Sequence, residues 1–411
     1  MFRILLFGPV SGPLSPPPPP PSRANIPSTD PGNPAPPAPV PSRANIPSTD
    51  PGTPLPPPHR KFAILATLVA AASAHGMRGS DDQFSHQVAF KQFMNKHGKV
   101  YQTQEEHNTR FETFKKNVRE ARTLNTALKA KGKDEIHGVT KFFDLERDEF
   151  EQMYLGGYYT KDDFPVLETA SFETKVDATS GTYNLSDDGL LTTVKDQASC
   201  GSCWAFSATE TLESAWAKAG NDLVELSPQQ IVSCDVGNGD YGCSGGMPST
   251  AFEYVFTAGG LASEADYPYT STTGVTGDCT SPLPEFTMHA GRTAAWAYAQ
   301  DACMPGSTEC TEDIDAIATA LKESGGISIA IDASSFFSYT GGVMTADSCS
   351  SNPSSLDHAI QIVGYDADAD TPYWIVRNSW AETWGEDGFV FMEMGTNTCG
   401  LANIAAIVTS L

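Results

Sequence analysis

The stretch from Gln197 to Ser207, QASCGSCWAFS, constrains this chain more than any other. It places Cys203 at the start of a predicted helix of good helix formers that continues to Trp216. One apolar face of that helix is formed by Ala205, Ala208, Leu212 and Ala215. Unpaired backbone N–H groups at a helix N-terminus carry partial positive charge, which favours a thiolate. The stretch therefore predicts a reactive cysteine that acts as a nucleophile.

Charge is distributed unevenly along the 411 residues, which are enough for two or three domains with a packed core. From Thr179 to the end, 30 acidic and 5 basic residues give a net charge of −25. The first 178 residues hold 20 acidic and 21 basic residues. An acidic surface of this kind repels nucleic acid and anionic membranes, so we expect neither as a partner. It suits an acidic compartment, where protonation relieves the repulsion.

Nine cysteines lie in the acidic part of the chain, and the simplest interpretation is four disulfides and one free thiol in an exported protein. The alternatives are a reduced intracellular chain or a zinc site. Zinc is disfavoured because Cys200–Cys203 is the one CxxC, without a second CxxC or a matching His pair. A thioredoxin-like role needs a preceding βαβ pattern, which the sequence lacks. We expect no metal and no cofactor.

Residues 1–58 are proline-rich and contain the string PSRANIPSTDPG twice, at 21–32 and 41–52, a composition that cannot bury a core. Residues 59–74 follow as a basic start, an apolar run and an Ala-Ser-Ala end, which predicts a secretory signal peptide. A signal peptide should begin a protein. We therefore expect a mispredicted start, with a real proline-rich extension as the rival.

Residues 81–170 predict a helical domain. Positions spaced by three or four residues share one helical face: Glu106, Arg110, Phe114, Asn117, Ala121 and Asn125. An apolar stripe covers the same helix, formed by Phe111, Phe114, Val118 and Ala121. Periodicity alone indicates no more than an amphipathic helix.

A nucleophilic cysteine needs a base, usually histidine. The acidic part of the chain contains His289, in an irregular polar stretch where an exposed or structural role is expected, and His358. His358 opens an alternating run that predicts a strand. Asn378 follows a second apolar strand, Tyr373–Val376, and could orient the imidazole. A lone histidine at a strand end is more often structural than catalytic, so this evidence is modest by itself.

Together these motifs resemble the papain family of cysteine peptidases, in its cathepsin L-like branch. The resemblance covers roughly residues 81–411 and rests on the cysteine stretch, on Asp357-His358-Ala359 and on Asn378-Ser379-Trp380. It also rests on the family's interspersed Glu-Arg-Phe-Asn-Ile-Asn motif, with Ala121 at the Ile position, and on Gly138, Thr140, Phe142 and Asp144. It implies an α+β fold with a helical lobe carrying Cys203, a β-rich lobe carrying His358 and Asn378, and a self-inhibiting propeptide over residues 81–170.

The resemblance also implies the role of each residue. Cys203 and His358 would form a thiolate–imidazolium pair, with a thiol pKa of about 3–4. Asn378 would hold the imidazole, and Trp380 would shield that hydrogen bond. The side-chain amide of Gln197 and the backbone N–H of Cys203 would stabilise the oxyanion.

The substrate-binding positions follow from the same resemblance. Gly245 and Gly246 match the strand that pairs with an extended peptide, and Asp357 and Trp380 border the site. The pocket for the residue two before the cut would be lined by Met247, Pro248, Ala330, Leu356, Ala359 and Ile404. These residues are apolar or small, so we expect a hydrophobic or aromatic residue there and no arginine. For one or two of them, plain core packing is the alternative.

No paired-histidine occluding segment is visible, which favours an endopeptidase over a dipeptidase. Partners would be protein and peptide substrates, the chain's own propeptide and inhibitors of the cystatin type. We expect a monomer that is secreted or delivered to a lysosome or vacuole. The mature chain, residues 179–411, would begin near Thr179, and Asn184-Leu185-Ser186 is a glycosylation sequon.

Family pairing implies the disulfides Cys200–Cys243, Cys234–Cys279 and Cys349–Cys399. Cys303 and Cys310 lie in an insertion, where they are expected to close a small extra loop. Ala198 and Ala381 replace family glycines, and a positive φ at either would strain the backbone.

Two other function classes are compatible with parts of the pattern. A catalytically silent binding protein on the same scaffold would have lost its nucleophile, and Cys203 is intact. A cysteine acyltransferase of the transglutaminase type would incorporate amines rather than hydrolyse peptides, and the propeptide motifs argue against it.

Overall fold

The computed structural model describes residues 79–156, 169–173, 175–237, 239–291, 294–307 and 309–411. The proline-rich repeats and the predicted signal peptide lie outside these ranges. Within them, no helix combines the length and the apolar character that crossing a bilayer requires.

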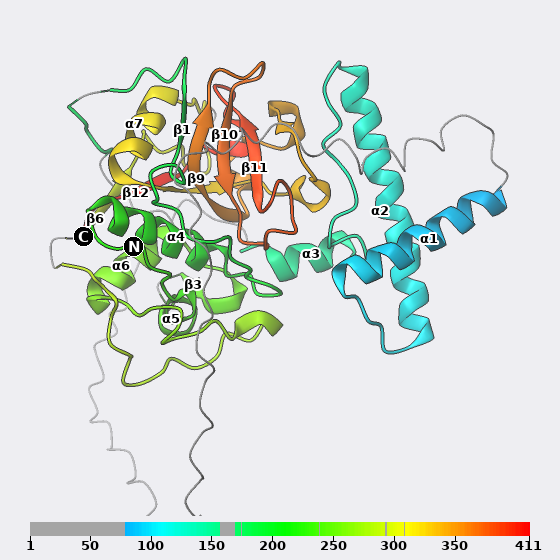
Figure 1. The fold of residues 1–411 in the computed structure, drawn as a ribbon, viewed down its shortest axis with the longest axis horizontal. Coiled ribbons are helices and arrows are strands. Elements are labelled where there is room, and N and C mark those ends of the chain that lie inside the picture. The colour runs from blue at the N-terminus through cyan, green and yellow to red at the C-terminus, as the bar shows by residue number, and fades with distance from the viewer. Residues whose placement is uncertain (1–78, 157–168, 174, 238, 292–293, 308) are drawn as a thin grey trace, which may run out of the picture. The chain divides into compact units, whose positions relative to one another are not determined.

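The described chain begins with a helical segment, residues 79–156, made of α1 (Gly79–His97), α2 (Gln104–Ala130) and α3 (Arg147–Tyr154) (Figure 1). Helices α1 and α2 pack through phenylalanine rings, with the Phe90 and Phe93 centroids 5.2 and 5.1 Å from that of Phe114. Phe114 is fully buried. The apolar stripe predicted along α2 is thus the core of this segment.

The polar members of the α2 motif hold the loop that returns along the helix. Arg110 donates to the backbone carbonyl of Asp144 at 3.0 Å. The buried Asn117 amide donates to two loop carbonyls, each at 3.0 Å. Asn125 exchanges two hydrogen bonds with the backbone of His137. These contacts need particular side chains, which is why the motif specifies more than an amphipathic helix.

The helical lobe follows and is built on α4 (Cys203–Lys218), α5 (Pro228–Cys234) and α6 (Pro248–Ala258). Its short strands form two separate pairs, β2 (Val236–Gly237) with β3 (Asp240–Tyr241) and β4 (Gly260–Leu261) with β5 (Met288–His289). His289 is exposed in β5, not in the irregular stretch that the sequence predicted.

Helix α4 is buried on nearly every side, and the prediction of a single apolar face was therefore too narrow. Its polar residues Ser207, Glu210 and Glu213 are all at most 1% exposed. The cause is its central place, with α5 and α6 on one side and the large sheet on the other (Figure 1). Ser207 Oγ donates to the carbonyl of Ile360 in that sheet at 2.8 Å.

The β-rich lobe is organised around one sheet with the strand order β6-β12-β7-β9-β10-β11-β8 among the described residues, and β1 pairs with β9. The neighbours are antiparallel except β11 and β8. Helix α7 (Ile314–Ser324) packs on the sheet. The strands are β1 (Thr182–Asn184), β6 (Ala295–Tyr298), β7 (Ile327–Ile331), β8 (Val343–Met344), β9 (His358–Asp366), β10 (Tyr373–Arg377), β11 (Phe389–Glu393) and β12 (Ala405–Ser410).

Sheet register brings two of the predicted site residues to one end of the sheet. His358 is the first residue of β9, and Asn378 directly follows the last residue of β10. The two strands run antiparallel, with Arg377 opposite Gln361. The start of one strand and the end of the other therefore lie together.

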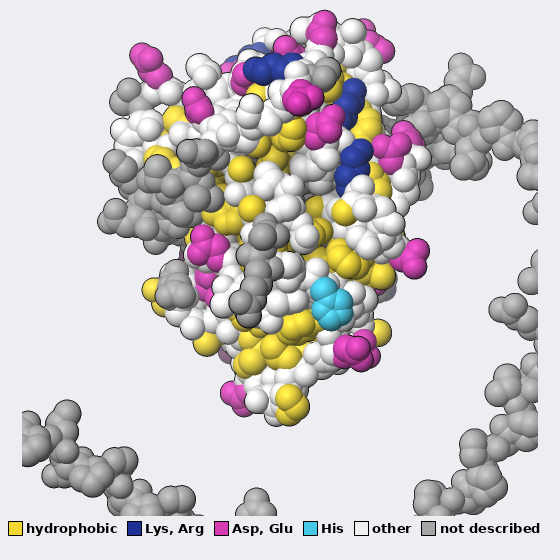
Figure 2. All heavy atoms as spheres, turned by 90° about the vertical axis from the view of Figure 1, so that its left-hand side faces the viewer, with side chains coloured by type: hydrophobic (Ala, Val, Ile, Leu, Met, Phe, Trp, Pro, Cys, Tyr) yellow, Lys and Arg dark blue, Asp and Glu magenta, His cyan; other side chains and the backbone are white. Residues whose placement is uncertain are grey.

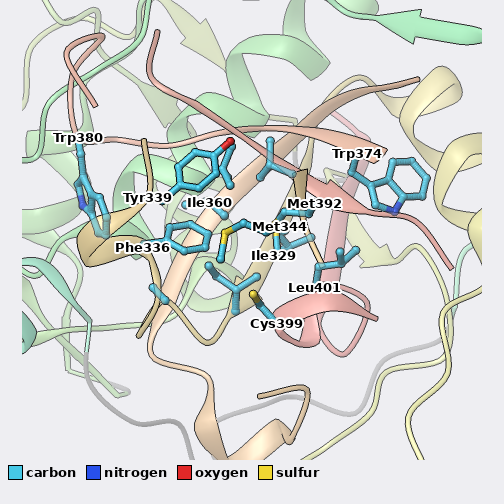
Figure 3. Close-up of a cluster of buried hydrophobic side chains, with 14 of the residues drawn as sticks. Ile329, Phe336, Tyr339, Met344, Ile360, Trp374, Trp380, Met392, Cys399 and Leu401 are labelled. Atoms are coloured by element: carbon cyan, nitrogen blue, oxygen red, sulfur yellow. The ribbon is translucent and has the colours of Figure 1, made fainter. Parts of the chain in front are cut away.

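A layer of large apolar side chains fills the β-rich lobe between the sheet and the loops that cover it (Figure 3). Phe336, Tyr339 and Trp380 lie on one side of this layer, and Ile329 and Met392 project from the strands. All five side chains are fully buried. This core fixes Trp380, the residue predicted to shield the site.

Four disulfides cross-link the chain after residue 179: Cys200–Cys243, Cys234–Cys279, Cys303–Cys310 and Cys349–Cys399. Cys203 remains free and buried. Acidic side chains are spread over the face drawn in Figure 2, whereas Lys and Arg side chains gather in its upper part. Ala198 and Ala381 adopt positive φ values of 50° and 63°, so the strain foreseen at both positions is present.

Candidate active site

The sulfur of Cys203 lies between the two lobes. Cys203 begins α4, and its side chain is fully buried. The backbone N–H groups that face the sulfur belong to Ala359 in β9, to Trp204 in α4 and to Gly156 of the helical segment. The residue before Ala359 is His358, so the helix start and the sheet end meet at this sulfur.

The imidazole of His358 is held on one side and free on the other. Its Nε2 atom lies 2.9 Å from Asn378 Oδ1, and its Nδ1 atom has no hydrogen-bond partner among the described residues. The Trp380 ring packs against the imidazole, with centroids 4.6 Å apart. Trp380 therefore excludes water from the hydrogen bond between His358 and Asn378.

Burial disfavours the charged form of both groups. It raises the pKa of the Cys203 thiol to about 12 and lowers the pKa of His358 to about 4. Both shifts favour the uncharged forms while the site is covered, and the thiolate–imidazolium pair stays a prediction for the uncovered site. The physical reason is that burial removes the hydration that would stabilise either charge.

Gln197 has its amide fixed at both ends. Its Nε2 donates to the carbonyls of Cys200 at 2.8 Å and of Tyr154 at 3.0 Å, and its Oε1 accepts from Ser379 Oγ at 2.6 Å. Tyr154 belongs to the helical segment. The donor that the resemblance assigns to an oxyanion is therefore occupied by a backbone carbonyl of the chain itself.

The backbone from Tyr154 to Gly156 covers the rest of the site. The N–H of Gly156 donates to the carbonyl of Asp357 at 2.9 Å. A Cβ atom at Gly245 would collide with the Gly156 carbonyl, and one at Gly201 would lie 2.8 Å from the Leu155 carbonyl. The two glycines are needed for this close approach of the helical segment.

Aromatic rings anchor the helical segment next to the sulfur. The rings of Phe142 and Phe150 meet the Trp380 ring edge to face, with centroids 5.1 and 5.5 Å away. Phe150 also contacts Phe337 at 5.2 Å, and the guanidinium of Arg147 lies 4.0 Å from the Phe337 ring centroid. The segment therefore docks on the same tryptophan that shields His358.

Comparison with known proteins agrees with this geometry. The family model for papain family cysteine proteases matches residues 179–409, and the model for the cathepsin propeptide inhibitor domain matches residues 90–150. A cysteine proteinase of Trypanosoma brucei brucei is 35% identical over 82% of this chain and 70% of its own length.

The chain belongs to the papain family of cysteine proteases.

Other relatives and solved structures extend this result. The thiol protease aleurain of Arabidopsis thaliana is 36% identical over 79% of this chain and 84% of its own length. Recombinant stem bromelain precursor has a TM-score of 0.64 at 30% identity and covers 79% of this chain and 99% of its own. Digestive procathepsin L 3 of Tenebrio molitor has a TM-score of 0.65 at 28% identity with the same coverage. The chain is thus a cathepsin L-like cysteine peptidase with an inhibitory prosegment, of which residues 79–156 are the described helical part.

The pocket residues expected in this protease are all buried. Four of the six share one apolar cluster: Met247, Ala330, Leu356 and Ile404. Pro248, at the start of α6, and Ala359, in β9, are buried outside that cluster. Gly245 and Gly246 lie in no strand of the structure, although the resemblance implied one.

Sequence reasoning missed the polar groups that support this site. Ser379 orients the Gln197 amide, and only its place between Asn378 and Trp380 could have signalled it. Arg377 is fully buried, donates to Gln361 Oε1 at 2.7 Å and lies 3.4 Å from Glu210 Oε2. For Arg377, the available signal was a charged residue within an apolar strand.

Proposed function

We propose that this protease is an endopeptidase in which Cys203, His358, Asn378 and Gln197 act together. The meeting of the Cys203 sulfur with the His358 end of β9 carries the proposal. The 2.9 Å contact between His358 Nε2 and Asn378 Oδ1 supports it, because it leaves Nδ1 free for a proton.

Once the prosegment leaves, water can reach the thiol and the imidazole, and the proton moves from Cys203 to His358 Nδ1. The thiolate then attacks the peptide carbonyl carbon, a sulfur–carbon bond forms, and the carbonyl π electrons move to oxygen. Gln197 Nε2 and the Cys203 N–H would stabilise this oxyanion, because the same amide already donates to the Tyr154 carbonyl.

His358 next donates its proton to the leaving nitrogen as the carbon–nitrogen bond breaks. It then takes a proton from water, which attacks the thioester and releases the acid. Asn378 keeps the ring in position through both steps, and Trp380 keeps bulk water from their hydrogen bond.

Substitution of Cys203 by serine tests the proposal. We expect kcat/KM for peptide hydrolysis to fall by at least about 10⁴-fold, because the thiolate is lost. The variant should keep the parent's unfolding temperature. A matched pair of variants, His358→Ala and His289→Ala, should separate the base from the exposed histidine. Peptide cleavage that persists in Cys203→Ser would refute the assignment.

The preferred residue two before the cut is hydrophobic or aromatic in this proposal. The apolar cluster of Met247, Ala330, Leu356 and Ile404 supports this, because a charged side chain would lose hydration there without a partner. Two peptide series that differ only at this position, with Phe or Leu against Arg, test the preference by kcat/KM.

We also propose that the precursor is activated at acidic pH. His137 Nδ1 lies 2.9 Å from Ser338 Oγ where the prosegment meets the β-rich lobe, and burial lowers the pKa of His137 to about 4. Between the ordinary pKa of about 6.5 and this value, a released prosegment binds more protons than a docked one. Acid therefore favours release, which labelling of Cys203 by an epoxysuccinyl inhibitor can follow.

The remaining proposals concern the export and processing of the chain, its inhibitors and its oligomeric state. Residues 59–74 would direct export to the exterior or to a lysosome or vacuole, and the mature chain would begin near Thr179. The start of the papain family match at residue 179 supports this boundary. N-terminal sequencing of acid-processed protein tests it. Cystatin-type inhibitors and a monomeric state belong to the same proposal.

A further inference from the structure

A pair of buried carboxyl groups lies behind the segment from Gly245 to Met247. Asp240, in β3, is fully buried, and Asp235, which follows α5, is 8% exposed. Asp240 Oδ1 accepts the Met247 N–H at 2.7 Å and the Thr250 hydroxyl at 3.0 Å. Asp240 thus fixes the backbone of a residue in the proposed substrate pocket.

Gly246 is confined by the same carboxyl. A Cβ atom there would lie 2.5 Å from Asp240 Oδ1 and 2.6 Å from the ring of Trp204, the residue after Cys203. The Gly246 backbone is therefore held between Asp240 and the helix that carries the nucleophile. A displacement of the Asp240 carboxyl would move the segment against which substrate binds.

The second oxygen of each carboxyl indicates that the pair needs a shared proton. Asp235 Oδ2 and Asp240 Oδ2 are buried without a hydrogen-bond donor among the described residues, yet the two side chains interact directly. Two carboxylates in contact cannot both stay ionised away from water. One shared proton removes the conflict, because a protonated Oδ2 donates to the other.

The surroundings decide which residue carries the proton. Met247 N–H and the N-terminal turn of α6 point to Asp240, and a helix N-terminus favours a negative charge. Asp240 is thus the carboxylate and Asp235 the acid. Burial raises the pKa of Asp235 to about 8 and that of Asp240 to about 6, in the same order.

The charged and titratable neighbours do not stabilise a second negative charge. Glu253, on α6, adds to the repulsion at Asp235, and Asp235 contributes to the raised pKa of the Tyr254 phenol. Among the described residues, no Lys or Arg side chain acts on either carboxyl. Proton loss therefore leaves two repelling carboxylates behind the substrate-binding segment.

We propose that Asp235 and Asp240 share one proton and act as a positioning pair for Gly246 and Met247, so that substrate binding weakens when this proton is lost. The substrate part rests on the proposed function, whereas proton sharing does not. Both carboxyls have pKa values above the ordinary value of about 3.9. The stabilisation by the shared proton is therefore present in acid and lost as pH rises through the raised pKa of Asp235, about 8.

Asp235→Asn tests the proposal, because its Nδ2–H can donate to Asp240 Oδ2 at any pH. In the full-length Cys203→Ser precursor, we expect the unfolding temperature to fall between pH 6 and pH 9. With Asp235→Asn added, this fall should be smaller by at least about 3 °C. Asp222→Asn, which removes an exposed acid, is the matched control and should keep the parent's fall.

Kinetics of the acid-processed enzymes give the second readout. Between pH 6 and pH 9, on either side of the raised pKa of Asp235, the parent's KM should rise at least about threefold. The KM of Asp235→Asn should rise by less than half as much in the same interval. The pH dependence of kcat, which Cys203 and His358 govern, should be the same in both.

The proposal would be overturned if Asp235→Asn and the parent had the same pH dependence of unfolding temperature and of KM. If Asp235→Asn does not fold, Asp240→Asn takes its place, since its Oδ1 can still accept from Met247 and its Nδ2 can donate to Asp235. Failure of both amide variants to fold would also count against proton sharing. A parent that folds but does not hydrolyse peptides would refute the proposed function, while the unfolding measurement would still decide on the proton.

Discussion

The prosegment buries histidines, whereas the peptidase domain buries carboxyl groups, and the two respond to acid in opposite directions. Burial lowers the pKa of His97 and of His137 to about 4. Glu146 and Glu149 have pKa values below the ordinary range because each carboxylate accepts a hydrogen bond from a cation. All four groups bind fewer protons in the folded prosegment than in an unfolded one, so acid weakens the prosegment.

In the peptidase domain, burial acts on several acids, while His358 is a buried histidine there whose pKa burial lowers to about 4. It raises the pKa of Glu210 to about 7, that of Asp235 to about 8 and that of Asp240 to about 6. These groups bind more protons in the folded domain than in the unfolded chain. Their contribution to stability is present in acid and falls as pH rises through these values.

Loss of hydration therefore has opposite effects in the two regions. In acid it destabilises the docked prosegment through its histidines and stabilises the peptidase domain through its buried acids. Asp357 is the exception, because Gly156 covers it and burial raises its pKa to about 7. Its protonation favours docking. The disulfides also distinguish the peptidase domain from the prosegment, since all four lie after residue 179.

The largest effect should come from removing the aromatic anchor of the prosegment. Phe150 is 1% exposed and contacts both Trp380 and Phe337. Truncating a buried phenylalanine costs about 3–5 kcal/mol, so Phe150→Ala should raise the rate of epoxysuccinyl labelling of the precursor at pH 7 by at least about 100-fold. Labelling at the parent's rate would show that the prosegment does not depend on this anchor.

The control for the anchor is Val139→Ala, which trims a side chain that is 38% exposed in the same segment. It should label at the parent's rate. After removal of the prosegment, both variants should match the parent in kcat/KM, because neither residue lies in the peptidase domain.

A smaller effect is expected at His137, and it tests whether acid weakens the docking of the prosegment. Asn can keep a hydrogen bond to Ser338 but takes up no proton. Acid should therefore release the His137→Asn prosegment less readily, and the pH of half-maximal labelling should move down by about half a unit or more. A shift to higher pH would contradict the proposed role of His137. His289→Asn, at an exposed position, is the control.

The smallest effect should be independent of pH. Ala381 has a φ of 63°, where alanine costs about 1–2 kcal/mol and glycine is unstrained. After the entropy that glycine loses on folding, Ala381→Gly should stabilise the Cys203→Ser precursor by about 0.5–1 kcal/mol. Unfolding temperatures at pH 5 and pH 8 should rise equally. Ala208→Gly, inside α4, should lower both.

Much of the fold and of the candidate site could be predicted because short sequence motifs contain the residues that carry the chemistry of the site. A cysteine at a helix start is visible in QASCGSCWAFS, and β9 and β10 were visible as apolar runs beside His358 and Asn378. The prosegment could be predicted for the same reason, since its motif residues contact a loop close in sequence.

The burial of the site, and the direction of the pKa shifts that it causes, could not be predicted in this way. Burial raises the pKa of the Cys203 thiol, and the groups around its sulfur include Gly156, about fifty residues earlier in the chain. The all-round burial of α4 and the contact between Arg377 and Glu210 likewise depend on elements from both lobes. Periodicity describes one element and contains no information on what packs against it.

The sequence by itself determined that this protein is a papain-family protease with a prosegment, because those identities depend on residue types at set spacings. Only the tertiary structure decided which backbone atoms occupy the site and which acids and bases lose water. The reason is that hydration depends on every neighbour in space. Asp235 and Asp240 are two ordinary acids in the sequence, and they become a pair when folding excludes water from both.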